Sequence, residues 1–243
     1  MTINAAPLPH ARSIVFFAHC HPVQSILHRP SFLAALVQGF VPPHLLYATC
    51  ALGIRHWPGQ KMLSGSQQLT SKDFAREARN LILNDSNSGE SIFKIPNSVD
   101  VAQTLCLLLW LDEENSRDKE NYRDLALQVT EDLGILPTSE GMSMTEPMRA
   151  TSREDMDMEC LRRVFWSIFV WDCWRCLFPP STSRQTHPHG NFPSSSMLAP
   201  YGYSPVQMRI RLPVDESSFE MVKLHEAPFE SIEGQVRIYP LRL

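Results

Sequence analysis

The sequence predicts an all-α protein, an irregular helical bundle or array with a long Ser/Pro-rich loop near the C-terminus. Apolar residues recur at the three- or four-residue spacing of a helix in successive segments. Capping residues and glycines stand where those segments begin and end. Alternating strand patterns are scarce. The chain has 243 residues, 43% of them hydrophobic, which is enough apolar surface for a sizeable core.

Helical signals begin in the first third of the chain. Residues 32–40 form a short apolar stretch that suits a helix. The next helix is expected to follow Pro42 and Pro43, because proline is tolerated in the first turn. Apolar residues of 45–53 follow at helical spacing, and residues 56–59 end that element.

A third segment carries its own start signal. Thr70 stands three residues before Asp73, which is the spacing of a capping box. The apolar residues of 74–82 then fall on one helical face, and residues 84–89 are a polar break.

The middle of the chain predicts a central helix. Asn97 or Ser98 can cap a helix that is apolar nearly all round over 101–111, so this helix should lie inside the bundle. An apolar stripe over 122–133 predicts the following helix, and Gly134 stands where a C-terminal cap glycine belongs.

The longest predicted helix comes next. Ser152 and Asp155 form another capping-box pattern, and the helix should run to about Phe178 before two prolines. Asp172 and Arg175 are expected to pair on its surface, because residues three apart on a helix are neighbours. Residues 181–207 are rich in Ser, Pro and His and predict a long irregular loop.

Charge and hydropathy exclude some functions. Lys plus Arg number 22 and Asp plus Glu 26, a net charge of −4, whereas nucleic-acid binders usually carry a basic surplus. Autonomous DNA or RNA binding is therefore not expected. The longest apolar stretch, 101–111, is shorter than the roughly 20 residues of a membrane span, so no membrane partner is expected.

Residues with metal or catalytic chemistry lack a recognisable site pattern. The only CxxC, 173–176, has no second pair, and Cys50, Cys106 and Cys160 lie in apolar stretches and are expected to act as small core hydrophobes. Neither histidine pair, at 19–21 or at 187–189, has a carboxylate at a sequence spacing that would complete a known metal site. No nucleophile elbow, phosphate loop or HExxH occurs. We expect no enzyme and no catalytic, cofactor or metal residue; a metal-dependent helical enzyme is the least favoured alternative.

Tryptophans on the predicted central helices suggest a ligand pocket as an alternative interpretation. Trp110, Trp166 and Trp171 are more often core residues than a ligand cage, but a buried tryptophan near a cleft can line a pocket. A small-molecule sensing domain is the second function considered.

Five segments carry motifs that occur in the same order in one known family. They lie at 16–32 (aromatics, then His-Pro and Ile-Leu-His-Arg-Pro-Ser-Phe), 45–55 (Ala-Leu-Gly), 102–136 (Asp-Leu-Gly-Ile), 159–175 (Arg-Arg-Val-Phe-Trp) and 212–219 (Leu-Pro-Val-Asp-Glu). Together they resemble the fungal-specific transcription factor domain, the middle homology region of fungal zinc-cluster transcription regulators.

The resemblance assigns a set of motif positions, for which we expect mainly structural roles. These positions are His21, Pro22, His28, Arg29, Pro30, Phe32, Gly53, Gly134, Arg162, Arg163, Trp166, Asp172, Pro213, Asp215 and Glu216.

The resemblance also implies a function. It implies a nuclear regulatory or interaction domain that modulates RNA polymerase II transcription through partner or effector contacts, with DNA reached only indirectly. The expected partners are proteins, including a second copy or a full-length relative, with a small-molecule effector as a further candidate. Zinc is implied only for the N-terminal module of full-length relatives, because the cysteines here lack the close spacing of a zinc cluster.

The same resemblance sets the expected domain boundaries. Residues 1–13 are an N-terminal tail, 14–220 a partial regulatory domain, and 221–243 a C-terminal tail. A truncated bundle would leave apolar faces uncovered, which predicts a dimer or poor solubility for the isolated chain.

Overall fold

The structure, a computed structural model, describes residues 7–56, 69–84, 96–111, 116–135, 152–177, 210 and 212–222. Every regular element in these ranges is a helix, and none of the described residues forms a strand. The predicted all-α fold class is confirmed. The predicted loop at 181–207 lies outside the described residues, as does the side chain of Ser152.

The N-terminal part contains five short elements. They are α1 (Pro7–His19), the 3-10 helix η1 (Val23–Ile26), α2 (Arg29–Gln38), α3 (Pro43–Gly53) and the 3-10 helix η2 (Ile54–His56). Helix α1 begins ahead of the boundary expected at residue 14, within the segment that the sequence suggested was a tail.

Helix α2 starts earlier than the apolar pattern predicted. His28 is its N-cap, and the backbone N–H of Ser31 donates to His28 Nδ1 at 3.3 Å. Arg29 and Pro30 therefore form the first turn of α2, ahead of the apolar stretch that begins at Phe32. The reason is that proline is compatible with the first helical positions, where its missing N–H costs no hydrogen bond.

Two cap predictions are confirmed in α4 (Ser71–Asn84) and α5 (Val99–Leu109). The N–H of Thr70 donates to Asp73 Oδ2 at 2.9 Å, and the N–H of Asp73 donates to Thr70 Oγ1 at 3.3 Å. The N–H of Thr70 and its hydroxyl, which donates to the same Asp73 oxygen at 2.8 Å, lower the pKa of the Asp73 carboxyl. At the start of α5, Ser98 Oγ accepts from the N–H of Val101 at 3.2 Å.

The remaining helices are α6 (Ser116–Asp132), α7 (Ser152–Leu177) and the short α8 (Glu216–Glu220). Gly134 follows α6 with φ of 86°, a left-handed conformation that glycine adopts at little cost. Its N–H donates to the carbonyl of Glu131 at 2.9 Å, and the N–H of Ile135 donates to that of Thr130 at 3.1 Å. This is the Schellman arrangement, so the predicted glycine cap is confirmed.

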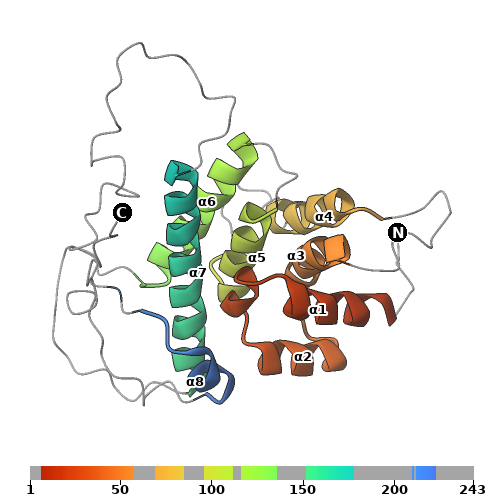
Figure 1. The fold of residues 1–243 in the computed structure, drawn as a ribbon, viewed down its shortest axis with the longest axis horizontal. Helices are drawn as coiled ribbons and strands as arrows, with labels where there is room; N and C mark the ends of the chain where they lie inside the picture. The colour runs from red at the N-terminus through yellow and green to blue at the C-terminus, as the bar shows by residue number, and fades with distance from the viewer. Residues whose placement is uncertain are drawn as a thin grey trace, which may run out of the picture.

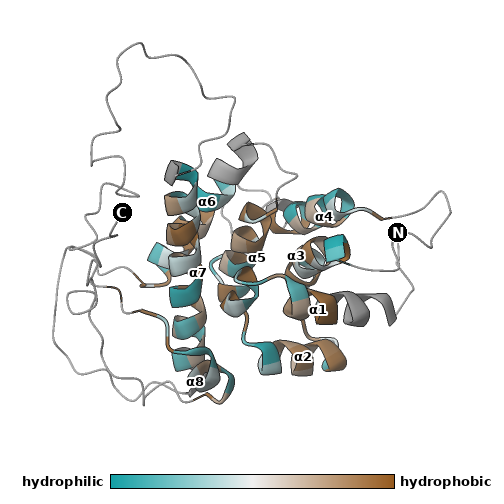
Figure 2. Ribbon diagram, viewed as in Figure 1, coloured by the Kyte–Doolittle hydropathy of each residue, from teal (hydrophilic) through white to brown (hydrophobic). Residues whose placement is uncertain are grey.

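Helix α5 occupies the centre of the assembly (Figure 1). It contacts α3 and α4 on one side and α6 and α7 on the other. Figure 2 shows α5 as hydrophobic over most of its length, and every residue of 101–109 is buried. The apolar stretch that the sequence placed inside the bundle is therefore its core.

No single helix among the described residues is long and apolar enough to cross a membrane. Helix α2 and the segment of α3 and η2 reach the length and hydropathy of a membrane span only when taken together, and the two are bent by 114° relative to each other. Much of this pair packs into the core of the protein, including the fully buried Ala48 and Ala51.

The glycine cap of α6 allows a direct test. Nothing lies within 4 Å of a Cβ built on Gly134, so Gly134→Ala should cost only left-handed backbone strain. We expect Gly134→Ala to lower the free energy of unfolding by about 1 kcal/mol, measured by urea denaturation. Gly134→Asn should cost less, because asparagine tolerates this conformation. An equal loss for both variants would contradict the explanation.

Candidate functional site

A polar cluster built around a buried ion pair joins helix α7 to two distant segments. The Arg163 junction, as we call it, consists of Ser25, Glu159, Arg163, Val214 and Glu216. The side chains of Arg163 and Glu159 are only 4% and 1% exposed. An ion pair this deep is tolerated only when both partners are well hydrogen-bonded, so its contacts must be nearly complete.

The guanidinium group of Arg163 makes four such contacts. Its Nε lies 3.1 Å from Glu159 Oε1, one turn earlier on α7. Its Nη1 donates to the carbonyl of Ser25 at 3.1 Å and to Glu216 Oε2 at 2.7 Å. Its Nη2 donates to the carbonyl of Val214 at 2.7 Å. One side chain thus holds three stretches of the chain.

The same junction receives support from the neighbouring side chains. The N–H of Val214 donates to Glu159 Oε1 at 2.9 Å, and Arg162 pairs with the second oxygen of that carboxylate. The guanidinium of Arg163 also lies 3.8 Å from the ring centroid of the fully buried Phe219, within the range of a cation–π contact. Glu159 therefore shares its charge between two arginines and a backbone amide.

His28 connects α2 to the same place. Its ring meets Phe219 edge-on, with centroids 5.0 Å apart, and its Nε2 lies 3.4 Å from the carbonyl oxygen of Glu220. Asp215 caps α8 by accepting from the N–H of Ser218 at 2.9 Å. Motif positions from three separate segments therefore converge, a convergence that spacing along the sequence could not predict.

Other motif positions serve local packing or caps. Phe32 and Gly53 are buried, Pro213 is half-buried, and His21 is exposed beside Pro22. The guanidinium of Arg29 lies 6.0 Å from the ring centroid of its neighbour Phe17.

The expected surface pair of Asp172 with Arg175 is wrong. Asp172 is 8% exposed and pairs with Arg123 on α6. Arg123 Nε donates to Asp172 Oδ1 at 2.7 Å, and Arg123 Nη2 donates to Asp172 Oδ2 at 2.9 Å. A carboxylate at this depth needs a cation, and the fork of Arg123 matches it. Arg175 instead lies 4.8 Å from the ring centroid of Trp171.

The tryptophans of the predicted pocket mainly contact other helix residues. Trp110 Nε1 donates to Ser167 Oγ at 3.0 Å, which fixes the end of α5 on α7. Trp166 meets Phe169 edge-on, and Trp171 is 6% exposed. The clefts described below are lined by other residues, so a pocket at these tryptophans stays a prediction.

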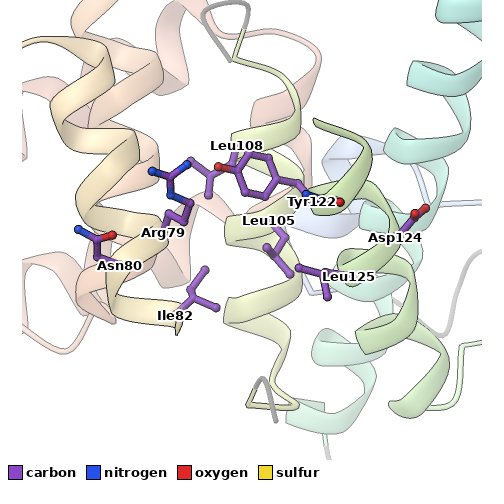
Figure 3. A pocket seen from close by; sticks show the side chains of 9 residues that line it. Arg79, Asn80, Ile82, Leu105, Leu108, Tyr122, Asp124 and Leu125 are labelled. Carbon is purple, nitrogen blue, oxygen red and sulfur yellow. The ribbon is translucent and has the colours of Figure 1, made fainter. Parts of the chain in front are cut away.

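A cleft of about 640 Å³ lies between α4, α5 and α6. We call it the α4–α6 cleft. Its apolar part comes from Ile82, Leu105, Leu108 and Leu125, and Arg79 adds a cation from α4 (Figure 3). No pattern in the sequence predicts this cleft, because it depends on how far apart α4 and α6 lie.

A second hollow of about 850 Å³ lies between α2, α5 and α7. Phe40 lines it and is 76% exposed, and the nearby Val37 is 77% exposed. Trp174 on α7 is 60% exposed. These apolar surfaces are compatible with the predicted self-association, which stays a prediction.

Among the described residues, the cysteines and histidines do not gather into a site. Burial raises the pKa of the Cys106 and Cys160 thiols to about 12 and that of Cys20 to about 11, so these thiols stay protonated at neutral pH. The rings of His19 and His56 stack with centroids 5.7 Å apart. In the part of the chain that the structure describes, no three His, Cys, Asp or Glu side chains are arranged to hold a metal ion. The pair at 187–189 lies outside that part.

Removing the cation of the junction should be costly. Arg163→Met keeps a long apolar stem but leaves Glu159 buried with one arginine fewer. We expect the free energy of unfolding, measured by chemical denaturation, to fall by about 3 kcal/mol. Arg76→Met is the matched control, because the Arg76 side chain is 59% exposed and its pair with Asp73 should contribute little. A loss for Arg163→Met no larger than that for the control would contradict a structural role for the junction.

The comparisons with known proteins agree with the motifs. The fungal specific transcription factor domain matches residues 14–178, which include α2 to α7 and Arg163. A Schizosaccharomyces pombe protein described as an uncharacterized transcriptional regulatory protein is 28% identical over 162 residues, covering 65% of this chain and 16% of the relative. No solved structure matches the chain. The match covers well over half of the sequence, and the chain belongs to the fungal specific transcription factor domain family.

Proposed function

We propose that this chain is a regulatory domain of a fungal transcription factor, and that it acts in the nucleus through contacts with a partner protein or an effector. It modulates transcription by RNA polymerase II without touching DNA itself. The observation that supports the proposal is the match of residues 14–178 to the fungal specific transcription factor domain.

The charge distribution supports an indirect route to DNA. Binding to DNA draws most of its affinity from lysines and arginines that neutralise phosphates. The net charge here is −4. Arg123, Arg162 and Arg163 already pair with carboxylates, and Arg163 is buried. The positive charges of these three arginines are therefore already neutralised by carboxylates within the folded chain.

The packing of α5 supports communication within the domain. Gln103 on α5 donates to the carbonyl of Ile26 at 2.8 Å, and the adjacent Ser25 accepts from Arg163. A contact that displaced α5 would therefore strain the Arg163 junction. Coupling of this kind needs a contiguous set of packed groups, and these residues supply one.

Small-molecule sensing is the second candidate function, and the α4–α6 cleft is the observation that favours it. Its volume of about 640 Å³ falls within the roughly 300–1,000 Å³ typical of ligand pockets. Sensing and regulation are compatible, since an effector in this cleft would contact α5 directly.

A tethering experiment tests the proposal. The chain is fused to an unrelated DNA-binding domain, and reporter transcription is compared with that of the DNA-binding domain alone. We expect the fusion to change transcription several-fold, because the domain acts once it is brought to a promoter. Arg163→Met should abolish the change, and Arg76→Met should keep it at matched protein levels.

DNA binding by the isolated chain provides the complementary measurement. Gel-shift titrations at physiological salt should give dissociation constants no lower than about 10⁻⁶ M, which is the high-affinity end of the range for non-specific binding. Sequence-specific binding at nanomolar concentration, or a fusion with no effect on the reporter, would contradict the proposal.

A further inference from the structure

The hollow between α2, α5 and α7 has an apolar rim with surface that is still exposed to solvent. We call it the α2–α7 hollow. The side chains of Phe40 and Val222 line it and are 76% and 45% exposed. The half-buried apolar residues of the same lining include Ala35, Pro42, Val99 and Leu133. An apolar segment that docked here would remove this surface from water, which is favourable.

The end of α2 fixes the position of Phe40. Gly39 has a φ of 75°, its N–H donates to the carbonyl of Leu36 at 3.2 Å, and the N–H of Phe40 donates to that of Ala35 at 2.8 Å. This is a second Schellman arrangement, in which the residue after the glycine usually packs on the residue that stands at Ala35. A methyl group is too small to cover a phenyl ring. The ring therefore stays open on an ordered backbone, which lowers the entropic cost of binding to it.

The chain leaves α8 at the same hollow. Val222 has a φ of 58°, a conformation that β-branched residues rarely adopt. Backbone strain of this kind persists where the surrounding contacts compensate for it. Because the side chain of Val222 lines the hollow, a segment that fills the hollow would supply such contacts. The residues that follow Val222 in the sequence also start at the hollow.

Residues 236–243 provide an apolar segment a short distance further along the sequence. They read Val-Arg-Ile-Tyr-Pro-Leu-Arg-Leu, so that all but the arginines and the proline have large apolar or aromatic side chains. The thirteen residues 223–235 can span up to about 43 Å when extended, which is enough to reach the whole hollow. A tether of this kind keeps the segment at a local concentration of about 1 mM, so that even a weak contact is occupied.

The charges of the hollow agree with this segment. Asp100 and Asp157 line the hollow, and among the described residues no lysine or arginine does so. Both carboxylates have other interactions within the chain, so we assign neither of them an ion pair with the segment. Their sign favours a segment that carries Arg237 and Arg242 over an acidic one.

We propose that residues 236–243 dock in the α2–α7 hollow of their own chain and cover Phe40 and Val222. The docked segment closes an apolar surface of the domain and competes with any protein partner that uses the same surface. This inference goes beyond the regulatory function proposed above and does not depend on it. A second copy of the chain is the rival occupant of the hollow, and the experiments separate the two.

A matched pair of variants on α2 tests the hollow. Phe40→Asp removes the exposed ring, and Val37→Asp is the control, because Val37 is 77% exposed and is not among the residues that line the hollow. In the full chain we expect the amides of 236–243 to exchange hydrogen several-fold more slowly than in a free peptide of the same sequence. Phe40→Asp should restore the rate of the free peptide, and Val37→Asp should not. Circular dichroism spectra should be unchanged in both variants.

A second pair of variants tests the segment itself. Ile238→Asp combined with Leu241→Asp should release the segment from the hollow. Phe229→Asp combined with Ile232→Asp changes only the tether and should not release it. A fluorescent peptide with the native sequence of the segment should bind one site on the released chain. It should bind the native chain at least about tenfold more weakly, because the tethered segment already occupies the site. Adding Phe40→Asp to the released chain should abolish peptide binding.

The outcomes distinguish docking within one chain from docking on another. Exchange of 236–243 at the rate of the free peptide, equal acceleration by Phe40→Asp and Val37→Asp, or equal peptide binding by native and released chains would each overturn the proposal. Protection that rises with protein concentration, together with a dimer in light scattering that Phe40→Asp dissociates, would assign the hollow to a second copy and overturn it as well. Protection that is the same at low and high protein concentration, with one-site peptide binding only to the released chain, would support it.

Discussion

Glu159 is an acidic side chain inside the protein, and such a group is stable as an anion only if a cation accompanies it. Arg163 supplies that cation one turn along α7, and its remaining donors reach the carbonyls of Ser25 and Val214. Residues far apart in the sequence therefore converge on one guanidinium group. The placement of α8 against α7, and of the N-terminal segment against both, follows from satisfying this buried pair.

The central helix relates this junction to the cleft. Helix α5 provides Leu105 and Leu108 to the floor of the α4–α6 cleft, and through Gln103 it holds the carbonyl of Ile26 beside the junction. Its far end is fixed to α7 by the hydrogen bond from Trp110 to Ser167. A ligand that shifted α5 would thus act on groups that the junction already constrains. This arrangement suits a domain that converts binding at one surface into a changed contact at another.

Local features of this fold could be predicted from the sequence, and features that depend on tertiary placement could not. The caps at Thr70, Ser98 and Gly134 were predictable because each depends on residues within five positions of one another. The partner of Asp172 was not, because Arg123 reaches it from another helix. Helix α1 was missed because its apolar pattern is short.

The candidate site shows the same division. The motif positions His28, Arg163 and Glu216 were identified by resemblance, but their meeting at one place needed the fold. The α4–α6 cleft left no signal in the sequence, because Arg79 and Leu125 read as ordinary residues of two separate amphipathic helices.

Hydrogen exchange tests the central role of Arg163 most directly. The backbone amides of Val214 and Phe219 donate to Glu159 and to the carbonyl of Asp215, so both should exchange slowly in the native protein. In Arg163→Met we expect residues 212–222 to exchange many times faster, while the buried residues of 101–109 in α5 remain protected under conditions where the variant is folded. Equal protection of 212–222 with and without Arg163 would contradict the account, because the segment would then be held by other contacts.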